Sequence, residues 1–457
     1  MSIGHNNASV QTGGSAPQPQ SGHSPSADSP REGFSADLSQ MDVAGFCADI
    51  ERLRAATLAR IGQADLHHLR RIEAYGRSAT LVGYATAWMI PNPVTAFLLS
   101  LGQFTRWLLA HHIIHRGYDR VPGIPAHYTS RTFARGWRRF VDWFDWLLPE
   151  AWDYEHNILH HYHTGEDSDP DLAERHVEFL RRSRMPVAFK YILVAIVACT
   201  WKIIYYAPNS LSVLDPNSRK RLRQDSIEYL TLLNIVDLRS PAVRRLWLHC
   251  YFPYTLWHFV AVPLLFLPLG STAAFFVLLN KLLAEAITNA HAFLVIGPNH
   301  TADDLYRFRF HYGDKGEFYV TQVMGSANYH CGTEFVDYMS IWLNYQIEHH
   351  LFPDLPMLQY RLIQPEVKAL CLKHHIPYRQ ESVFRRFSRL LDILVGRTSM
   401  RQLEAFPDTR PASSSPQTGE SSSDAPKSAI LSGLDPLGLG GLSGLISPPS
   451  ARTSGAG

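Results

Sequence analysis

The sequence predicts an all-α protein in which multi-pass membrane helices, arranged as two hairpins with about four spans, carry a helical cap on the cytoplasmic side. Long apolar runs occur within residues 78–110, 246–268 and 270–296, and about 20 apolar residues suffice to cross a bilayer. Trp and Tyr, which favour membrane interfaces, occur 10 and 20 times in 457 residues. Many of the 23 histidines form tight groups beside the predicted membrane exits.

The two ends of the chain differ from its middle in composition. Residues 1–38 and 408–457 are rich in Ser, Gly and Pro, so we predict disordered tails there. The first ten residues lack a basic segment followed by an apolar one, which predicts no cleaved secretory signal. Residues 39–77 mix apolar and charged residues at helical spacing and predict a helical segment before the membrane. Residues 78–407 form the predicted membrane domain.

The membrane domain divides at its proline and glycine residues. Pro91-Asn92-Pro93 breaks the first apolar stretch and predicts a helical hairpin. The turn between 246–268 and 270–296 carries no charge, which predicts a second hairpin. Residues 185–208 are flanked by Arg and Lys at both ends, so we predict an interfacial or re-entrant segment there. Two hairpins return the chain to one side each time, which leaves residues 111–245 and 297–407 as the cap.

Composition argues against several classes of partner and cofactor. Lys and Arg total 43 against 41 acidic residues, and a net charge of +2 does not favour nucleic-acid binding. The five cysteines are scattered without a C-x-x-C pair, which predicts reduced structural residues rather than a zinc or redox site. No G-x-G-x-x-G or P-loop occurs, so the sequence supports no nucleotide cofactor bound by this chain.

Three histidine groups carry the functional signal. In a continued helix, His111 and His115 lie four residues apart and point the same way. His156 and His160 likewise share a face, and His161 turns about 100° away, able to reach a second ion. His349 and His350 form the third group. Neutral imidazole is a good ligand for iron, zinc, copper or nickel, and so many histidines are too many for one metal.

An acidic run, residues 167–171, follows the second histidine group. It resembles a calcium loop superficially, but neither the EF-hand glycine nor the closing glutamate follows at the required spacing. We therefore expect an exposed loop.

These motifs resemble those of the membrane fatty acid desaturases, a family defined by three histidine boxes. Gln346 to Pro353 reads QIEHHLFP, as in the third box of the front-end branch, and Asp337 and Asn344 also fall where that branch has Asp and Asn. The second box continues through Thr164 and a DPD sequence, and Asn299-His300 is similar to the pair after the last span of that branch. The resemblance covers about residues 80–385.

The resemblance implies two iron ions, with O2 as co-substrate. The implied iron ligands are His111, His115, His156, His160, His161, His300, His349 and His350. Gln346 stands where other branches have a histidine, so both a ligand and a supporting role are open. Asp337, Asn344 and Glu348 join it as groups that would aim the imidazoles. For His112 we expect an orienting role, and for His163, His291 and His330 a supporting or structural role.

The resemblance also implies the reaction. A reduced di-iron pair would use O2 to take hydrogen from two adjacent carbons of a fatty acyl chain, carried by a lipid or coenzyme A, and leave a cis double bond. No HPGG haem motif is present, so electrons would come from a separate ferredoxin-like or cytochrome b5-like donor. We expect the active site on the cytoplasmic side of the membrane.

Two alternatives stay open from the sequence. The same scaffold can hydroxylate an acyl, sphingoid or carotenoid carbon, because hydroxylation also begins with hydrogen abstraction. A non-enzymatic membrane protein that binds or transports metal is the second alternative. Against it, the histidines lie outside the predicted spans at fixed spacings.

Overall fold

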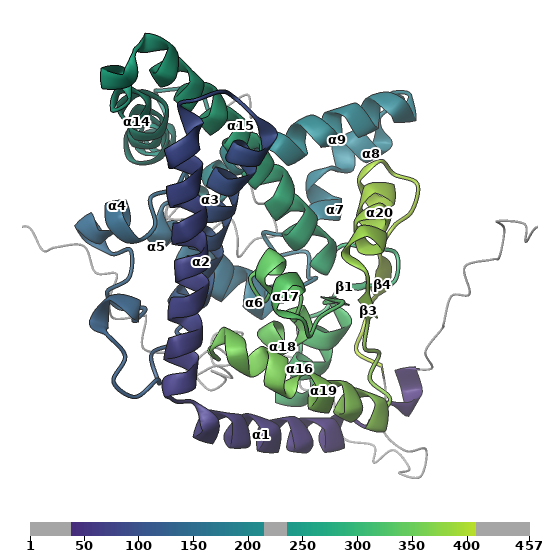
Figure 1. Cartoon of the computed structure of the whole chain (residues 1–457). Helices are drawn as coiled ribbons and strands as arrows, with labels where there is room; N and C mark the ends of the chain where they lie inside the picture. The colour runs from purple at the N-terminus through teal and green to yellow at the C-terminus, as the bar shows by residue number, and fades with distance from the viewer. Residues whose placement is uncertain (1–37, 214–234, 408–457) are drawn as a thin grey trace, which may run out of the picture. The chain divides into compact units, whose positions relative to one another are not determined.

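The structure, a computed structural model, describes residues 38–213 and 235–407 (Figure 1). Apart from Leu38, the predicted tails at 1–38 and 408–457 lie outside these residues, as does the basic flank at 219–221. The short turn η1 (Leu38–Gln40) opens the described chain. Two helices, α1 (Val43–Arg60) and the first part of α2 (Gln63–Ala87), occupy residues 39–77, and the position of this segment before the membrane stays a prediction.

The predicted break at residues 91–93 is confirmed as the turn of a hairpin between α2 and α3 (Pro93–Ile114). Asn92 caps α3 by accepting a hydrogen bond from the Thr95 N–H at 2.9 Å, and Pro93 suits the first helical position. The arms pack closely, since a Cβ added to Gly102 would lie 1.9 Å from the Thr80 hydroxyl oxygen. α2 begins well before residue 78, so the first arm is longer than predicted.

Among the described residues, three helical segments are long and apolar enough to cross a membrane: Val187–Ser212, Pro241–Leu269 and Ser271–Asn299. The last two correspond to the predicted second hairpin, and they meet at Gly270, whose φ of 108° suits glycine. Residues 185–208, for which we predicted an interfacial or re-entrant segment, largely coincide with the 26-residue candidate span, and their place in the membrane stays a prediction. The α2–α3 hairpin does not meet these criteria, so the predicted total of about four spans stays a prediction.

The three candidate spans are built from several helical pieces, with π-helical turns in two of them. Val187–Ser212 joins α9 (Val187–Trp201), η5 (Lys202–Tyr206) and α10 (Ala207–Ser212). The second span comprises α12 (Pro241–Leu246), η6 (Trp247–Tyr251), α13 (Phe252–Thr255), η7 (Leu256–Ala261), α14 (Val262–Leu264) and η8 (Leu267–Leu269). The third joins α15 (Ser271–Ile296) to η9 (Gly297–Asn299).

The remaining elements fall into two sets, one between α3 and the first candidate span and one after the third. The first set is η2 (Ala126–Tyr128), η3 (Gly136–Arg138), α4 (Arg139–Asp142), α5 (Pro149–Tyr154), η4 (Glu155–His160), α6 (His161–His163), α7 (Ala173–His176) and α8 (Glu178–Arg182). The second is β1 (Tyr306–Phe308), α16 (Lys315–Met324), β2 (Asn328–Tyr329), α17 (Glu334–Ser340), α18 (Gln346–Leu351), α19 (Met357–Lys373), β3 (Gln380–Glu381), α20 (Val383–Leu394) and β4 (Arg401–Leu403).

The mostly helical prediction is confirmed, but "all-α" is incomplete. β1 pairs in parallel with β4, with Tyr306 opposite Arg401, and β2 pairs in parallel with β3, with Asn328 opposite Gln380. Each strand pair joins segments more than 50 residues apart in the sequence, so a local alternation of apolar and polar residues does not predict these strands.

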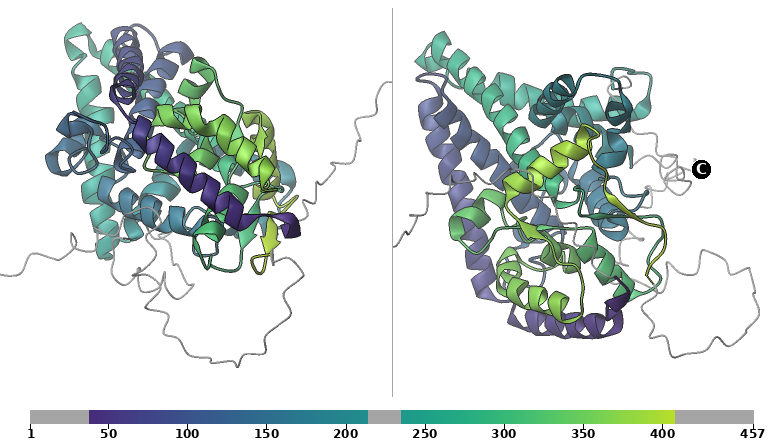
Figure 2. Two further views of the ribbon diagram at one scale, coloured as in Figure 1. Left: turned by 90° about the horizontal axis from the view of Figure 1, so that it is seen from below. Right: turned by 90° about the vertical axis from the view of Figure 1, so that its right-hand side faces the viewer.

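α1 lies along α16 and α19, as both views of Figure 2 show. The Arg54 guanidinium donates two hydrogen bonds to the Asp354 carboxylate, at 2.9 and 2.8 Å, and Arg120 also pairs with that carboxylate. Asp354 follows α18 in the chain, so the contacts of Arg54 tie α1 to the end of the third histidine group.

Candidate metal centre

The first histidine group ends α3. His111 and His112 occupy its last turn and His115 is its C-cap, and all three are buried. The rings of His111 and His115 lie 4.7 Å apart, centre to centre, as their four-residue spacing predicts. His112 turns away and donates a hydrogen bond from Nε2 to the Ile341 carbonyl at 2.8 Å. This contact agrees with the orienting role expected for His112.

The second group lies in a π-helical turn, η4, which runs into α6. A π-helix pairs residues five apart, so it brings residue i+5 back over residue i. The ring of His161 accordingly lies 5.0 Å from that of His156, the same separation as between His156 and His160. The three histidines therefore face one region, although an α-helix would have turned His161 further away.

The third group occupies α18, whose six residues are all buried. The adjacent histidines face different neighbours: the His349 ring lies 4.7 Å from His111 and 4.8 Å from His115, whereas the His350 ring lies 4.3 Å from His161. The turn before α18 is strained, because Ile341 and Trp342 have φ of 42° and 62°, which is costly for large side chains. The carbonyl that holds His112 belongs to this turn.

These segments, together with His300 at the end of the third candidate span, converge on one buried centre, here called the inner cluster. His111, His115, His156 and His349 form its first group, with ligand atoms all within 4.8 Å of one another. His160, His300 and His350 form the second group by the same measure. His161 lies within this distance of both His349 and His350, and therefore between the groups. The structure thus brings all eight predicted ligands together.

The inner cluster has free nitrogens that fit metal ions. Nε2 of His115 and of His350 and both ring nitrogens of His161 are buried without a hydrogen-bond partner, which is costly unless a ligand satisfies them. Nε2 of His111 lies 3.0 Å from Nε2 of His349. Two nitrogens bound at right angles to one ion, each about 2.1 Å away, are separated by about 3.0 Å. The donor set, imidazole throughout, suits iron, zinc or copper.

Electrostatics keep most of these imidazoles neutral, which is the form that binds metal. Burial and then the neighbouring His160 lower the pKa of His300 to about 3. Burial likewise lowers the pKa of His156 to about 4, against the opposing effect of Asp171. His160 differs: burial opposes its charged form, but the Asp169 carboxylate outweighs burial and raises the pKa.

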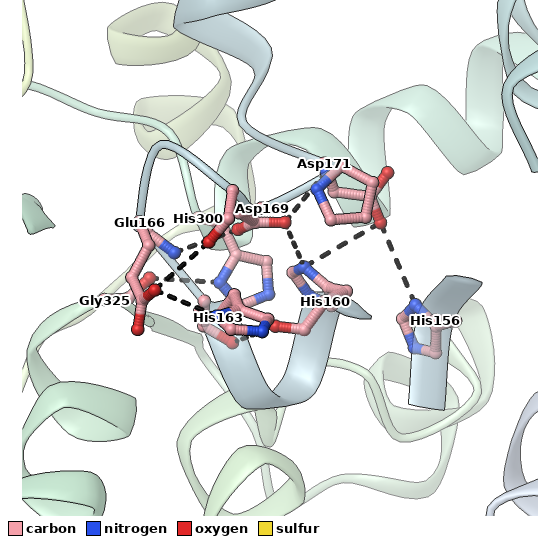
Figure 3. A network of polar contacts seen from close by, with 12 residues as sticks. His156, His160, His163, Glu166, Asp169, Asp171, His300 and Gly325 are labelled. Carbon is pink, nitrogen blue, oxygen red and sulfur yellow. Dashed lines mark hydrogen bonds and ion pairs between the residues drawn. The ribbon is translucent and has the colours of Figure 1, made fainter. Parts of the chain in front are cut away.

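In four histidines of the inner cluster, an oxygen atom lies beside the ring nitrogen that points away from the cluster. Figure 3 shows two of these contacts, from His160 to Asp169 and from His300 to Gly325. Each of these imidazoles has an oxygen within hydrogen-bond reach of its Nδ1, which directs Nε2 inward. The acceptors are Asp169 for His160 (2.9 Å), the Gly325 carbonyl for His300 (3.0 Å), Gln322 for His350 (2.9 Å) and Tyr360 for His349 (3.2 Å). Tyr360 accepts here because its own O–H faces the carbonyls of Phe352 and Pro353.

The acidic run at 167–171 is not the exposed loop that we expected. Asp169 is buried, and its carboxylate accepts from His160 Nδ1 as well as from the N–H groups of Gly165 and Asp171, both within 2.9 Å. Asp171 Oδ2 lies 3.8 Å from His156 Nδ1. Only the burial beside the second box, which composition does not reveal, distinguishes this run from a surface loop.

Of the predicted catalytic residues, Gln346 alone touches the inner cluster. Its Nε2 lies 2.8 Å from His300 Nε2, the nitrogen that a metal would use, and its Oε1 accepts from Asn299 Nδ2 at 2.9 Å. Asp337 and Asn344 contact each other instead, through a 2.7 Å hydrogen bond from Asn344 Nδ2. Asp337 also accepts from the Tyr345 hydroxyl at 2.9 Å, so this pair braces the loop before α18.

Glu348 anchors α18 from its other side. Its carboxyl oxygens accept from Asn328 Nδ2 at 2.7 Å and from the Tyr378 hydroxyl at 3.0 Å. Burial raises the pKa of this carboxyl to about 7. Because Glu348 immediately precedes His349, these bonds fix the rotation of the helix that carries both histidines.

The remaining histidines singled out from the sequence lie elsewhere. His163 pairs with Glu166, with Nδ1 2.9 Å from the carboxylate. His291 donates from Nε2 to the Met339 carbonyl at 2.8 Å, and His330 is exposed. None of these three belongs to the inner cluster.

Comparison with known proteins gives a consistent result. Residues 86–382 match the family model described as "Fatty acid desaturase". The chain is 24% identical over 372 residues to the "NADPH-dependent stearoyl-CoA 9-desaturase" of Mycobacterium tuberculosis, which covers 78% of this chain and 79% of that protein. Shorter matches are 38% identity over 84 residues to "Delta(8)-fatty-acid desaturase 2" of Arabidopsis thaliana, 18% of each chain, and 57% over 44 residues to "Fatty acid desaturase 3" of Bos taurus, 10% of each chain.

Proposed function

Since this chain belongs to the fatty acid desaturase family, we propose that it is an O2-dependent di-iron enzyme that inserts a cis double bond into a fatty acyl chain. The observation that carries the proposal is the inner cluster, in which eight histidines from four separate segments meet with unpartnered buried nitrogens. An unactivated C–H bond is too strong for a side-chain base, so acid–base catalysis alone cannot break it.

We assign one iron to His111, His115, His156 and His349 and the other to His160, His300 and His350. His161 can serve either ion from its position between the groups. When bound, the two irons supply the oxidising chemistry that the protein side chains lack. Overall, two hydrogen atoms leave adjacent carbons, O2 is reduced to two waters, and two electrons and two protons enter from a donor.

The protein's own part in this reaction is to orient and to exclude water. The Nδ1 contacts of His160, His300 and His350 select the tautomer that presents Nε2 to the centre. Gln346 lies beside Nε2 of His300, the nitrogen that we assign to the iron, so its side chain would lie next to the bound ion rather than hold the ring. The nearly complete burial of the cluster keeps bulk water from the reacting centre.

The membrane and an electron donor are the expected partners. The third candidate span ends beside the inner cluster, because His300 directly follows Asn299. We propose that the bilayer delivers the acyl chain and that the cluster lies on the cytoplasmic side. The donor is proposed as a separate ferredoxin-like or cytochrome b5-like protein; the name of the Mycobacterium relative includes NADPH dependence, which such a donor would relay.

The test is expression of the full chain in a host that lacks desaturation, followed by mapping of double bonds in its total fatty acids. We expect a product lighter by two hydrogens, absent when His350→Ala is expressed and present with His127→Ala, a change at an exposed histidine outside the cluster. A product heavier by one oxygen would identify a hydroxylase. Metal uptake without any lipid product, at full expression with the donor supplied, would contradict an enzymatic role.

A further inference from the structure

A second group of metal-binding side chains lies outside the inner cluster. His163 is the last residue of α6, Glu166 lies in the turn that follows, and His311 follows β1. The fold brings them together because the Phe308 N–H donates to the Gly165 carbonyl at 2.9 Å and Glu166 bridges to Phe308. Glu166, on one side of this junction, thus faces His311 on the other, although the two residues are 145 positions apart in the sequence.

The contacts within this group converge on one carboxylate. Nδ1 of His163 lies 2.9 Å from Glu166 Oε2, and Nδ1 of His311 lies 2.7 Å from Glu166 Oε1. The two imidazole rings are 5.2 Å apart, centre to centre. The three ligand atoms all lie within 4.8 Å of one another. Figure 3 shows His163 and Glu166 beside His160 and Asp169, on the far side of the turn from His156.

We propose that His163, Glu166 and His311, here called the outer site, bind a divalent transition-metal ion such as Zn2+. Two imidazoles and one carboxylate are a donor set that zinc accepts, with water as the fourth ligand. Ligands about 2.1 Å from a tetrahedral ion are about 3.4 Å apart, so the carboxylate must move away from His163 by about 0.5 Å and from His311 by about 0.7 Å. The exposure of His311 (47%) and His163 (31%) leaves room for that movement.

The surrounding charges permit a cation. The arginines at 307 and 309 are the nearby positive residues of β1 and its continuation, and both pair with Asp167. Arg307 also pairs with Glu174. The carboxylates of Asp167 and Glu174 thus offset part of this positive charge, and the Glu166 carboxylate itself hydrogen-bonds to the two histidines and the Ser168 hydroxyl.

The outer site is linked to the inner cluster through one short turn. The Asp169 N–H donates to the Glu166 carbonyl at 3.1 Å, and the Asp169 carboxylate faces His160. A metal on Glu166 would hold this turn and thereby the carboxylate that orients His160. We therefore expect outer-site occupancy to stiffen residues 163–169 without supplying a ligand to the inner cluster.

The experiment measures zinc bound to the purified, iron-loaded full chain by elemental analysis, after equilibration with buffered free Zn2+. The readout is the difference between the wild type and His311→Ala, because zinc in the inner cluster contributes equally to both. We expect about one zinc per chain more in the wild type. Glu166→Gln, which keeps the side-chain shape, should lose the same zinc, and His127→Ala, a matched change at an exposed histidine, should keep it.

Hydrogen exchange gives a second, independent reading. Zinc should slow amide exchange in residues 163–169 of the wild type and leave that of His311→Ala unchanged. Equal zinc content in the wild type and both outer-site variants would overturn the proposal, whatever the inner cluster binds. The proposal would also be overturned if all the zinc bound by the wild type had merely displaced iron from the inner cluster.

Discussion

Replacing Asp169 with asparagine tests how the inner cluster is oriented. The two carboxylate oxygens of Asp169 accept from three donors: His160 Nδ1, the Gly165 N–H and the Asp171 N–H. Asparagine offers one oxygen and one NH2 group in the same space. At least one of the three donors must therefore face another donor.

The size of the effect follows from burial. The side chains of His160 and Asp169 are each 2% exposed, so water cannot replace the lost acceptor. An unsatisfied buried donor costs about 1–3 kcal/mol, and each 1.4 kcal/mol changes an equilibrium about tenfold. Loss of a partner that orients a metal-bound histidine typically costs about 10–100-fold in affinity or activity. We therefore expect Asp169→Asn to weaken iron binding by about 10–100-fold.

The assay is iron content as a function of free iron, together with desaturation per bound iron. Asp237→Asn is the matched control, because Asp237 is exposed and its carboxylate accepts a backbone hydrogen bond from Arg239. We expect the control to behave as the wild type. Iron affinity and activity unchanged in Asp169→Asn would refute the reasoning that this carboxylate sets the His160 orientation.

Three further predictions follow from other contacts. Tyr360→Phe removes the oxygen beside His349 Nδ1 and should lower activity by about tenfold, while circular dichroism shows unchanged helix content; wild-type activity would contradict this. Burial opposes ionisation of Asp354, but hydrogen bonds and charges from Arg54 and then Arg120 outweigh burial and lower the pKa of Asp354. The ionised Asp354 carboxylate should therefore contribute its full stabilisation above about pH 4. This stabilisation should be lost as the pH falls further. Asp354→Asn should then lower the free energy of unfolding by about 3 kcal/mol at pH 7 and weaken its acid dependence, as measured by denaturant unfolding at each pH; a variant as stable as the wild type at pH 7 would exclude the ion pair. Iron removal by a chelator should lower the melting temperature, because an ion bound only to the folded state stabilises it, and iron should restore the melting temperature in the wild type and not in His350→Ala.

The sequence was most informative where spacing alone brings ligands together. His111 and His115 needed only a helix, and the structure places them as the four-residue spacing predicts. The turn at Pro91-Asn92-Pro93 was equally readable, because proline and an N-cap residue act locally. The QIEHH motif and Asn299-His300 depended on resemblance, and the structure brings His300, His349 and His350 into one cluster; their role as ligands stays a prediction.

The contacts that orient the histidines were beyond the reach of local patterns. Gln322 and Tyr360 reach their histidines from α16 and α19, and nothing in their own neighbourhoods marks them as different from core residues. The π-helical turn that returns His161 to His156 depends on one displaced hydrogen bond, which residue types do not specify. The first arm of the α2–α3 hairpin was misjudged because its polar beginning continues the same helix without a break.

The short helix α18 has a consequence for how the protein tolerates change. His349 and His350 are neighbours in the chain but serve different groups of the cluster. A single residue inserted ahead of them in α18 would rotate both imidazoles together by about 100°. Length variation at this point would therefore abolish both halves of the centre in one event, and compensation at either half alone could not recover it.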